Sequence, residues 1–317
     1  MKLSRTLFLG AAAAAALASA SPARACSVCG CGDPLLAASD PAAITGKLRL
    51  QLDTDYLRMD AGTEGNPNST DQLSQWSYRF NAAYRPIDDL SFLVTVPLVS
   101  KTMKASEGGA TTPMSDLTGL GDIEVAARYA FFRSVDLAKQ RAWEVAVTGG
   151  SMLPTGEHNA TADGVLIDAH GQIGTGGWGP FLGLAFLFEQ KDWLAFANAS
   201  YRVRTEATYD DGSKYKFGDA VLWSVHGQYR PMRRLALDLG VDGRYAMRDR
   251  QTEADGNLVP QVENTGGTVL SAAPGVYFEA GAGIWLFARG QIPFATSLYG
   301  LQKVYPGFTT GLQFQAF

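Results

Sequence analysis

The chain has 317 residues, of which 46% are hydrophobic, 11% aromatic and only 18% charged. Disordered chains lack aromatic residues and carry excess charge, so this composition excludes disorder. The two longest apolar runs, 7–18 and 178–188, are shorter than the roughly 18 to 20 apolar residues that a membrane-spanning helix requires. The composition therefore also excludes a helical membrane protein.

The first 25 residues have the three parts of a secretory signal. Lys2 and Arg5 make a basic start, 7–18 is an apolar run, and 23–25 is a small-residue cleavage site. Removal of this segment takes away three basic residues and no acidic ones, so the formal net charge falls from −4 to −7. A nucleic-acid partner needs a basic surface, and this charge excludes one. The mature chain is expected to work in an oxidising compartment outside the inner membrane.

Alternation of apolar and polar residues dominates the mature chain from about residue 48. In the run 76–85, for example, Trp76, Tyr78 and Phe80 alternate with polar residues. A period of two over such lengths predicts strands with one apolar and one polar face. The chain contains twelve candidate strands of this kind, near residues 44–59, 72–86, 90–103, 119–133, 141–154, 178–189, 192–206, 216–230, 234–249, 266–279, 283–297 and 303–317.

A soluble β-sandwich or solenoid would also alternate, but three features favour a membrane barrel. Many strands span 14 or more residues, against roughly 5 to 6 in soluble sheets. Short connections such as 86–89 alternate with long polar ones such as 155–177. Aromatic residues gather toward strand ends, at Tyr56, Trp76, Trp143, Trp193, Tyr201, Trp223 and Tyr245. The sequence thus predicts an all-β fold, a single transmembrane antiparallel β-barrel of about twelve strands, with short periplasmic turns and longer extracellular loops.

The predicted organisation has three parts. Residues 1–25 are the signal peptide, 26–43 a cysteine-containing periplasmic segment, and 44–317 the barrel. After Sec-type export the chain is expected in the outer membrane of a Gram-negative bacterium, with lipid as one partner and a small-molecule solute as another. The oligomeric state is left open.

The polar face of the strands is predicted to face the lumen. It carries many basic residues and some acidic ones, namely Arg49, Arg79, Arg85, Arg128, Arg202, Arg244, Arg289, Asp238 and Asp242. One interpretation is a salt-bridged core that fills a narrow barrel, because buried charges require partners. The other is a conducting path lined by arginine that favours anionic or polar solutes.

Several short glycine-rich segments resemble the motifs of a known protein family. The segment 119–123, followed by Arg128 and Tyr129, resembles the GLGD…KY hallmark of the outer-membrane family named after the meta-pathway of phenol degradation. Segments 173–178 and 265–267 resemble later motifs of that family in the same order. The resemblance implies an outer-membrane β-barrel that transports small, often hydrophobic or aromatic compounds, and it brings no catalytic residues.

The three cysteines of the chain are Cys26, Cys29 and Cys31. Thiolates at this spacing suit a soft metal, either Cu(I) with three sulfur ligands or zinc with Asp33 as a fourth ligand. The alternative is one disulfide and a leftover thiol. Lipidation of Cys26 is a third interpretation, although Ala23 stands where a large apolar residue is needed.

The histidines, His158, His170 and His226, lie near no recognisable nucleophile motif, so the chain is not expected to be an enzyme. The predicted function is that of a porin-like channel or transporter for a small solute. The alternative is a non-conducting barrel that anchors the cysteine segment in a metal-binding or redox role.

Overall fold

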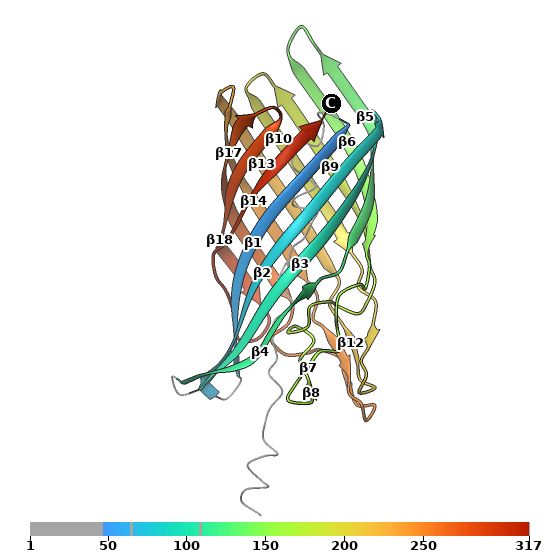
Figure 1. Ribbon diagram of the computed structural model, residues 1–317, viewed down its shortest axis with the longest axis vertical. Coiled ribbons are helices and arrows are strands. Elements are labelled where there is room, and N and C mark those ends of the chain that lie inside the picture. The colour runs from blue at the N-terminus through green and yellow to red at the C-terminus, as the bar shows by residue number, and fades with distance from the viewer. Residues whose placement is uncertain (1–46, 64–65, 108–109, 317) are drawn as a thin grey trace, which may run out of the picture.

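The computed structural model describes residues 47–63, 66–107 and 110–316, and these residues form one closed antiparallel β-barrel of twelve strands (Figure 1). Among them, no helix is long and apolar enough to cross a membrane. The predicted signal peptide and cysteine segment lie outside these residues. The predicted fold class is confirmed.

The strands pair with their neighbours in chain order around the wall, and β20 pairs with β1 to close it. They are β1 (Leu48–Thr63), β2 (Asn66–Ile87), β3 (Leu90–Glu107), β5 (Glu124–Asp136), β6 (Arg141–Met152), β9 (Gly179–Gln190), β10 (Trp193–Arg202), β13 (Ala220–Met232), β14 (Leu235–Ala246), β17 (Gly267–Gly281), β18 (Ile284–Leu298) and β20 (Gly307–Ala316). At the closing seam the rings of Tyr56, Trp76 and Phe308 are in mutual contact, with centroids 4.8 to 5.9 Å apart. Closure pairs each of these twelve strands on both sides, as the hydrocarbon of a membrane requires.

Two predicted loops are instead extensions of strands. The sequence predicts polar connections over 60–71 and 104–118, but β1 and β2 stay paired past residue 60, and β3 continues against β4 (Ala110–Leu120). Antiparallel pairing uses backbone groups alone, so a polar composition does not end it. The predicted strand 119–133 is divided between β4 and β5, because Gly121–Ile123 belong to neither strand.

The two faces of the strands differ as the alternation predicts. Leu52 is 51% exposed on the outside of β1, whereas its neighbours Gln51 and Asp53 are each 4% exposed. The cross-strand partner of Leu52, Phe80, is exposed as well. Apolar side chains outside and polar side chains inside are the reverse of a soluble protein and suit a lipid environment.

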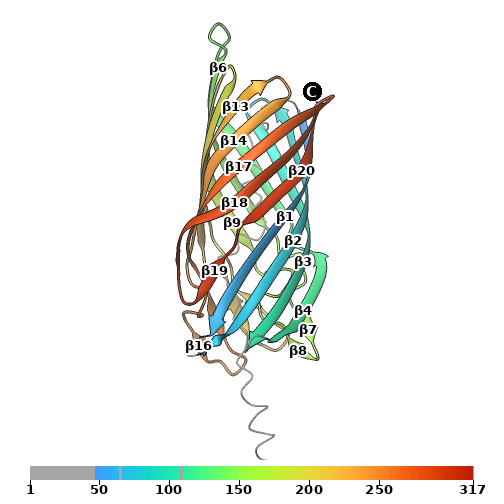
Figure 2. The same ribbon diagram turned by 90° about the vertical axis from the view of Figure 1, so that its left-hand side faces the viewer.

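The barrel has two different ends. At one, here called the turn end, consecutive strands are joined by short turns and the chain terminates (Figure 1). At the other, the loop end, the segments 153–178, 203–219 and 247–266 gather (Figure 2). These loops contain six short strands, β7 (Thr161–Ala162), β8 (Val165–Leu166), β11 (Ala207–Thr208), β12 (Lys214–Lys216), β15 (Arg250–Thr252) and β16 (Leu258–Val259). A further short strand, β19 (Gln302–Val304), pairs with β1.

Candidate functional site

A buried polar network crosses β1, β2 and β3 inside the barrel. Arg79 Nε donates to Asp53 Oδ1 at 2.6 Å, and Asn81 Nδ2 donates to Asp53 Oδ2 at 2.7 Å. Thr95 Oγ1 in turn donates to Asn81 Oδ1 at 2.7 Å. Buried charges are tolerated where partners of this kind neutralise them. The predicted inner residue Arg79 is therefore part of a satisfied network, and Arg49 is buried on the same face of β1.

Positive charge is concentrated near the turn end around one buried carboxylate. Arg128 Nη2 and Arg133 Nη2 lie 2.5 and 2.6 Å from the two oxygens of Glu144, whose side chain is 2% exposed. Arg85 is close enough for the charges of both arginines, Asp88 and Glu144 to act on it. The only other carboxylate paired with Arg133 in the described part of the chain, Asp89, is half exposed, at 3.8 Å. Arg128 and Arg133 therefore share one buried carboxylate, and both guanidinium groups are partly buried on the inner face.

The remaining predicted arginines lie on other parts of the inner wall. Arg202 reaches from β10 to Glu124 on β5, with Nη2 2.6 Å from Oε2, and its guanidinium lies over the ring of Phe181. Arg244 and Arg289 are partly buried on β14 and β18. The structure therefore distributes the predicted arginines around the barrel and does not gather them into one site.

The predicted residues Asp238 and Asp242 converge on one histidine. His226 Nδ1 is 2.8 Å from Asp238, and its Nε2 is 2.9 Å from Asp242. Phe196 stacks on the imidazole with an interplanar angle of 4°. The cross-strand partner of His226 is Gly240, where a Cβ atom would lie 2.2 Å from the imidazole. Glycine is therefore required for the histidine to lie flat against β14.

Toward the loop end, the inner wall that β1, β2 and β3 form becomes apolar. Met59, Leu73 and Met103 form a buried cluster contributed by β1, β2 and β3, and each side chain is at most 3% exposed. On β3, Met103 is the next inward-facing residue after Lys101 in the direction of the loop end. On β1, β2 and β3 the inner face thus changes from polar near the turn end to apolar near the loop end.

Asp122, from the glycine motif, holds both ends of the 153–178 loop. Its carboxylate accepts hydrogen bonds from the Gly156 N–H at 2.9 Å and from the N–H and hydroxyl of Thr175 at 2.8 and 2.7 Å. Gly156 and Gly174 touch through their backbones, and a Cβ on Gly174 would lie 2.4 Å from the Gly156 carbonyl oxygen. The motif therefore acts as an anchor that turns the loop back over the barrel.

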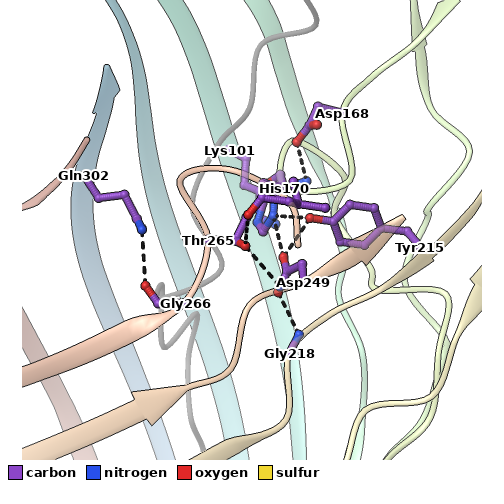
Figure 3. Close-up of polar contacts among 10 residues, drawn as sticks. Lys101, Asp168, His170, Tyr215, Gly218, Asp249, Thr265, Gly266 and Gln302 are labelled. Carbon is purple, nitrogen blue, oxygen red and sulfur yellow. Dashed lines mark hydrogen bonds and ion pairs between the residues drawn. The ribbon is translucent and has the colours of Figure 1, made fainter. Parts of the chain in front are cut away.

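A buried cluster then joins this loop to two others and to the wall (Figure 3). His170 Nε2 lies 2.9 Å from Tyr215 Oη and 3.0 Å from Asp249 Oδ2, and Tyr215 Oη donates to Asp249 Oδ2 at 2.7 Å. From the inner face of β3, Lys101 Nζ donates to the carbonyl oxygens of His170 and Gln172 at 3.2 and 2.5 Å. We call His170, Tyr215 and Asp249 the loop latch.

Burial is the main cause of the raised pKa values of two tyrosines in the loops. It raises the pKa of Tyr215 well above the ordinary value of 10, and the charge of Asp249 raises it further. Burial likewise raises the pKa of Tyr209, with a smaller contribution from Asp168. Both phenols therefore stay protonated over the physiological range. The three side chains of the latch contact one another, and these contacts hold the three loops together.

Sequence analysis missed the loop latch. The sequence pointed to His170 only as a histidine to be considered for catalysis, and Lys101, Tyr215 and Asp249 carry no motif. Asp122, in contrast, could have been selected from the sequence, because it lies in the glycine-rich motif 119–123. The predicted metal ligands Cys26, Cys29 and Cys31 lie outside the described residues, and within the described ranges no group of three or more His, Cys, Asp and Glu side chains is arranged to hold a metal ion.

No protein-family model matches the chain, and no curated protein does either. Among solved structures it is similar to an outer-membrane channel from Pseudomonas putida F1, with 13% identity and a TM-score of 0.60 over 85% of this chain and 96% of that one. The translocator domain of the autotransporter NalP from Neisseria meningitidis has 13% identity and a TM-score of 0.49, with 90% and 94% covered. The Ralstonia pickettii toluene transporter TbuX has 11% identity and a TM-score of 0.41, with 90% and 94% covered. The chain therefore shares the β-barrel fold of the Pseudomonas outer-membrane channel, and its apolar outer surface suits a lipid environment.

Proposed function

We propose that the barrel carries a small solute across the outer membrane, as a channel or facilitated transporter. The observation that supports this function is the charged inner face, where Arg128 and Arg133 share the buried carboxylate of Glu144. A barrel that served only as an anchor has no need of charged side chains on its inner face, because their burial is costly. Fixed positive charge inside a pore favours anions.

The nature of the solute is part of the proposal. The resemblance of segment 119–123 and the later glycine motifs supports membership of the outer-membrane family named after the meta-pathway of phenol degradation, and hence a hydrophobic or aromatic solute. The predicted lumen residues, from Arg49 to Arg289, are proposed to line its path. On this proposal the arginines set the ion preference of the pore, and the loop end selects the solute.

Planar-bilayer recording of the purified mature protein tests the function. We expect discrete conductance steps and, in a KCl gradient, a reversal potential that shows preference for chloride. Replacement of both Arg128 and Arg133 by glutamine should move that potential toward the cation side. Arg233→Gln, in an exposed turn, is the matched control and should leave it unchanged.

Liposomes that contain the protein should also become permeable to small solutes. An absence of conductance and of solute flux, both in the wild-type protein and in a variant with a loosened loop latch, would overturn the proposal. Such a result would favour the anchor role.

A metal site at Cys26, Cys29 and Cys31, occupied by Cu(I) or zinc, is likewise a proposal, supported by the spacing of the thiols. Metal analysis of protein purified under reducing conditions tests it against a variant with all three cysteines replaced by serine. Equal metal content in the two proteins would favour the disulfide instead.

A further inference from the structure

A groove of about 360 Å³ lies at the loop end, where the 247–266 loop meets the chain that follows β18. Arg248 and Arg250 line it together with Tyr245, Tyr299 and Gln261. No carboxylate is among the described residues that line it. A groove lined by charge of one sign concentrates ligands of the opposite sign, so this groove favours an anion.

Neither arginine of the groove is neutralised by the described part of the chain. Arg248 Nη1 donates to Gln261 Oε1 at 3.2 Å, and its guanidinium lies 4.8 Å from the centre of the Tyr299 ring. Both of these partners are uncharged. The side chain of Arg250 is exposed and forms no ion pair or hydrogen bond with the other described residues. The two guanidinium groups therefore keep donors for a ligand, and their planar geometry suits the oxygens of a phosphate.

A third basic residue faces the same way as Arg250. Lys216 of β12 lies directly opposite Arg250 of β15, and opposite residues of an antiparallel pair share one face of the sheet. Tyr215, on the other face, is buried in the loop latch, so Lys216 and Arg250 point outward. Like charges in this arrangement destabilise the strand pair. Asp219 lies 3.5 Å from Lys216, and a bound anion would compensate Arg250 as well.

The groove begins where the lipid-facing wall ends. Leu237 and Leu239 are exposed on the outer face of β14, and Tyr245 follows on the same face near the end of the strand. Tyr245 and Tyr299 share a side-chain hydrogen bond. Tyrosine and tryptophan mark the boundary between hydrocarbon and headgroups in membrane barrels. Arg248, just past Tyr245 in the chain, therefore lies at the level of the headgroups, and apolar chains can run along β14 below it.

A second pair of arginine and tyrosine on the outer surface provides a contrast. Arg58 lies 4.7 Å from the ring centre of Tyr305, and its Nε is 3.4 Å from Asp60 Oδ1. Asp60 also accepts a hydrogen bond from the Tyr305 hydroxyl at 2.6 Å. The charge of Arg58 is thus balanced by a neighbour in its own chain, whereas Arg248 has only uncharged partners among the described residues.

We propose that this groove binds the phosphate group of a membrane lipid. Arg248 and Arg250 hold the phosphate, Lys216 adds to the positive field, and the acyl chains lie along the outer face of β14. The site is on the outer surface of the barrel, so the proposal goes beyond the transport function and does not depend on it.

Native mass spectrometry of the full-length mature protein in a neutral detergent tests the proposal. The probes are phosphatidic acid and phosphatidylcholine with identical acyl chains, since only the first has a phosphate that no cationic group neutralises. We expect saturable binding of phosphatidic acid that is about tenfold tighter than binding of phosphatidylcholine. Replacement of both Arg248 and Arg250 by glutamine should weaken binding of phosphatidic acid about tenfold and leave phosphatidylcholine unchanged.

The matched control replaces Arg58 and Lys303 by glutamine. Both of these cations lie over the ring of Tyr305, so the control also removes two positive charges from the outer surface. It should bind phosphatidic acid as tightly as the wild type, and circular dichroism checks that both double variants keep their strands. Equal weakening in the two double variants, or equal binding of the two lipids by the wild type, would overturn the proposal.

Competition distinguishes a lipid from a soluble phosphate. Glycerol 3-phosphate carries the same phosphate group without acyl chains, and in large excess it should leave phosphatidic acid bound. Displacement of the lipid under these conditions would identify a soluble anion as the ligand and would contradict the assignment to a lipid.

Discussion

His170 Nε2 lies 3.0 Å from Asp249 Oδ2, and this contact joins two loops whose residues are far apart in the sequence. Both side chains are at most 5% exposed. Asp249 also accepts a hydrogen bond from the Gly218 N–H at 2.7 Å, and its own N–H donates to Thr265 Oγ1 at 3.0 Å. Asp249 therefore connects the three long loops at the loop end of the barrel.

Asp249→Asn should loosen the loops without unfolding the barrel. The carboxamide has one acceptor oxygen in place of two, so either Tyr215 or Gly218 loses its partner, at a cost of about 1–3 kcal/mol. We expect faster cleavage by added protease within 153–178 and 247–266, with the strands still protected. Asp210→Asn, an exposed loop carboxylate, is the control. Equal cleavage of both variants would show that the latch does not hold the loops.

Alkaline pH should open the same loops. Burial raises the pKa of Tyr215 and Tyr209 above 10, so above that pH the unfolded loops release protons that the folded loops retain. By linkage, the stability of the folded loops is fully present below about pH 10 and falls as pH rises beyond it. Protease protection measured at pH 9 and pH 11 should show this fall. It should be smaller in the Tyr215→Phe, Tyr209→Phe double variant, and an equal fall would contradict the assignment.

Asp122→Asn should change the electrical behaviour of the pore. The variant keeps one acceptor oxygen for Gly156 and Thr175, so the 153–178 loop is held at fewer points. We expect noisier current with more frequent steps between conductance levels in single-channel recordings. Asp116→Asn, an exposed residue of β4, should behave as the wild type. Identical current noise in the three proteins would exclude an anchoring role for Asp122.

Gly240→Ala should destabilise the barrel wall. The added Cβ would lie 2.2 Å from His226, which would have to leave its place between Asp238 and Asp242. Overpacking of this kind costs about 1–3 kcal/mol, and the displaced charges add to it. Gly227→Ala on the paired strand is the matched control, because nothing lies within 4 Å of its Cβ position.

The two variants are compared by urea unfolding, followed by tryptophan fluorescence. The midpoint should fall for Gly240→Ala and stay level or rise slightly for Gly227→Ala, since alanine reduces the freedom of the unfolded chain. A midpoint for Gly240→Ala at or above that of the wild type would contradict the packing argument.

The sequence by itself determined the strands and the faces of the barrel. Successive side chains of a strand point to opposite sides, so alternation such as that of Leu52 with Asp53 reports directly which residues face lipid and which face inward. Short turns between long alternating runs predicted antiparallel neighbours, and twelve such runs predicted the strand number that the structure has. These are local properties, readable from residues close together in the chain.

Only the tertiary structure decided how the inner charges pair and how the loops fold. Alternation places Arg202 inside but does not say that it reaches Glu124, 78 residues earlier. Loops have no period, so nothing in the sequence connects His170 with Asp249 or Lys101 with Gln172. Those contacts exist because closure of the barrel brings distant segments together at one end, where buried polar groups must find partners or remain costly.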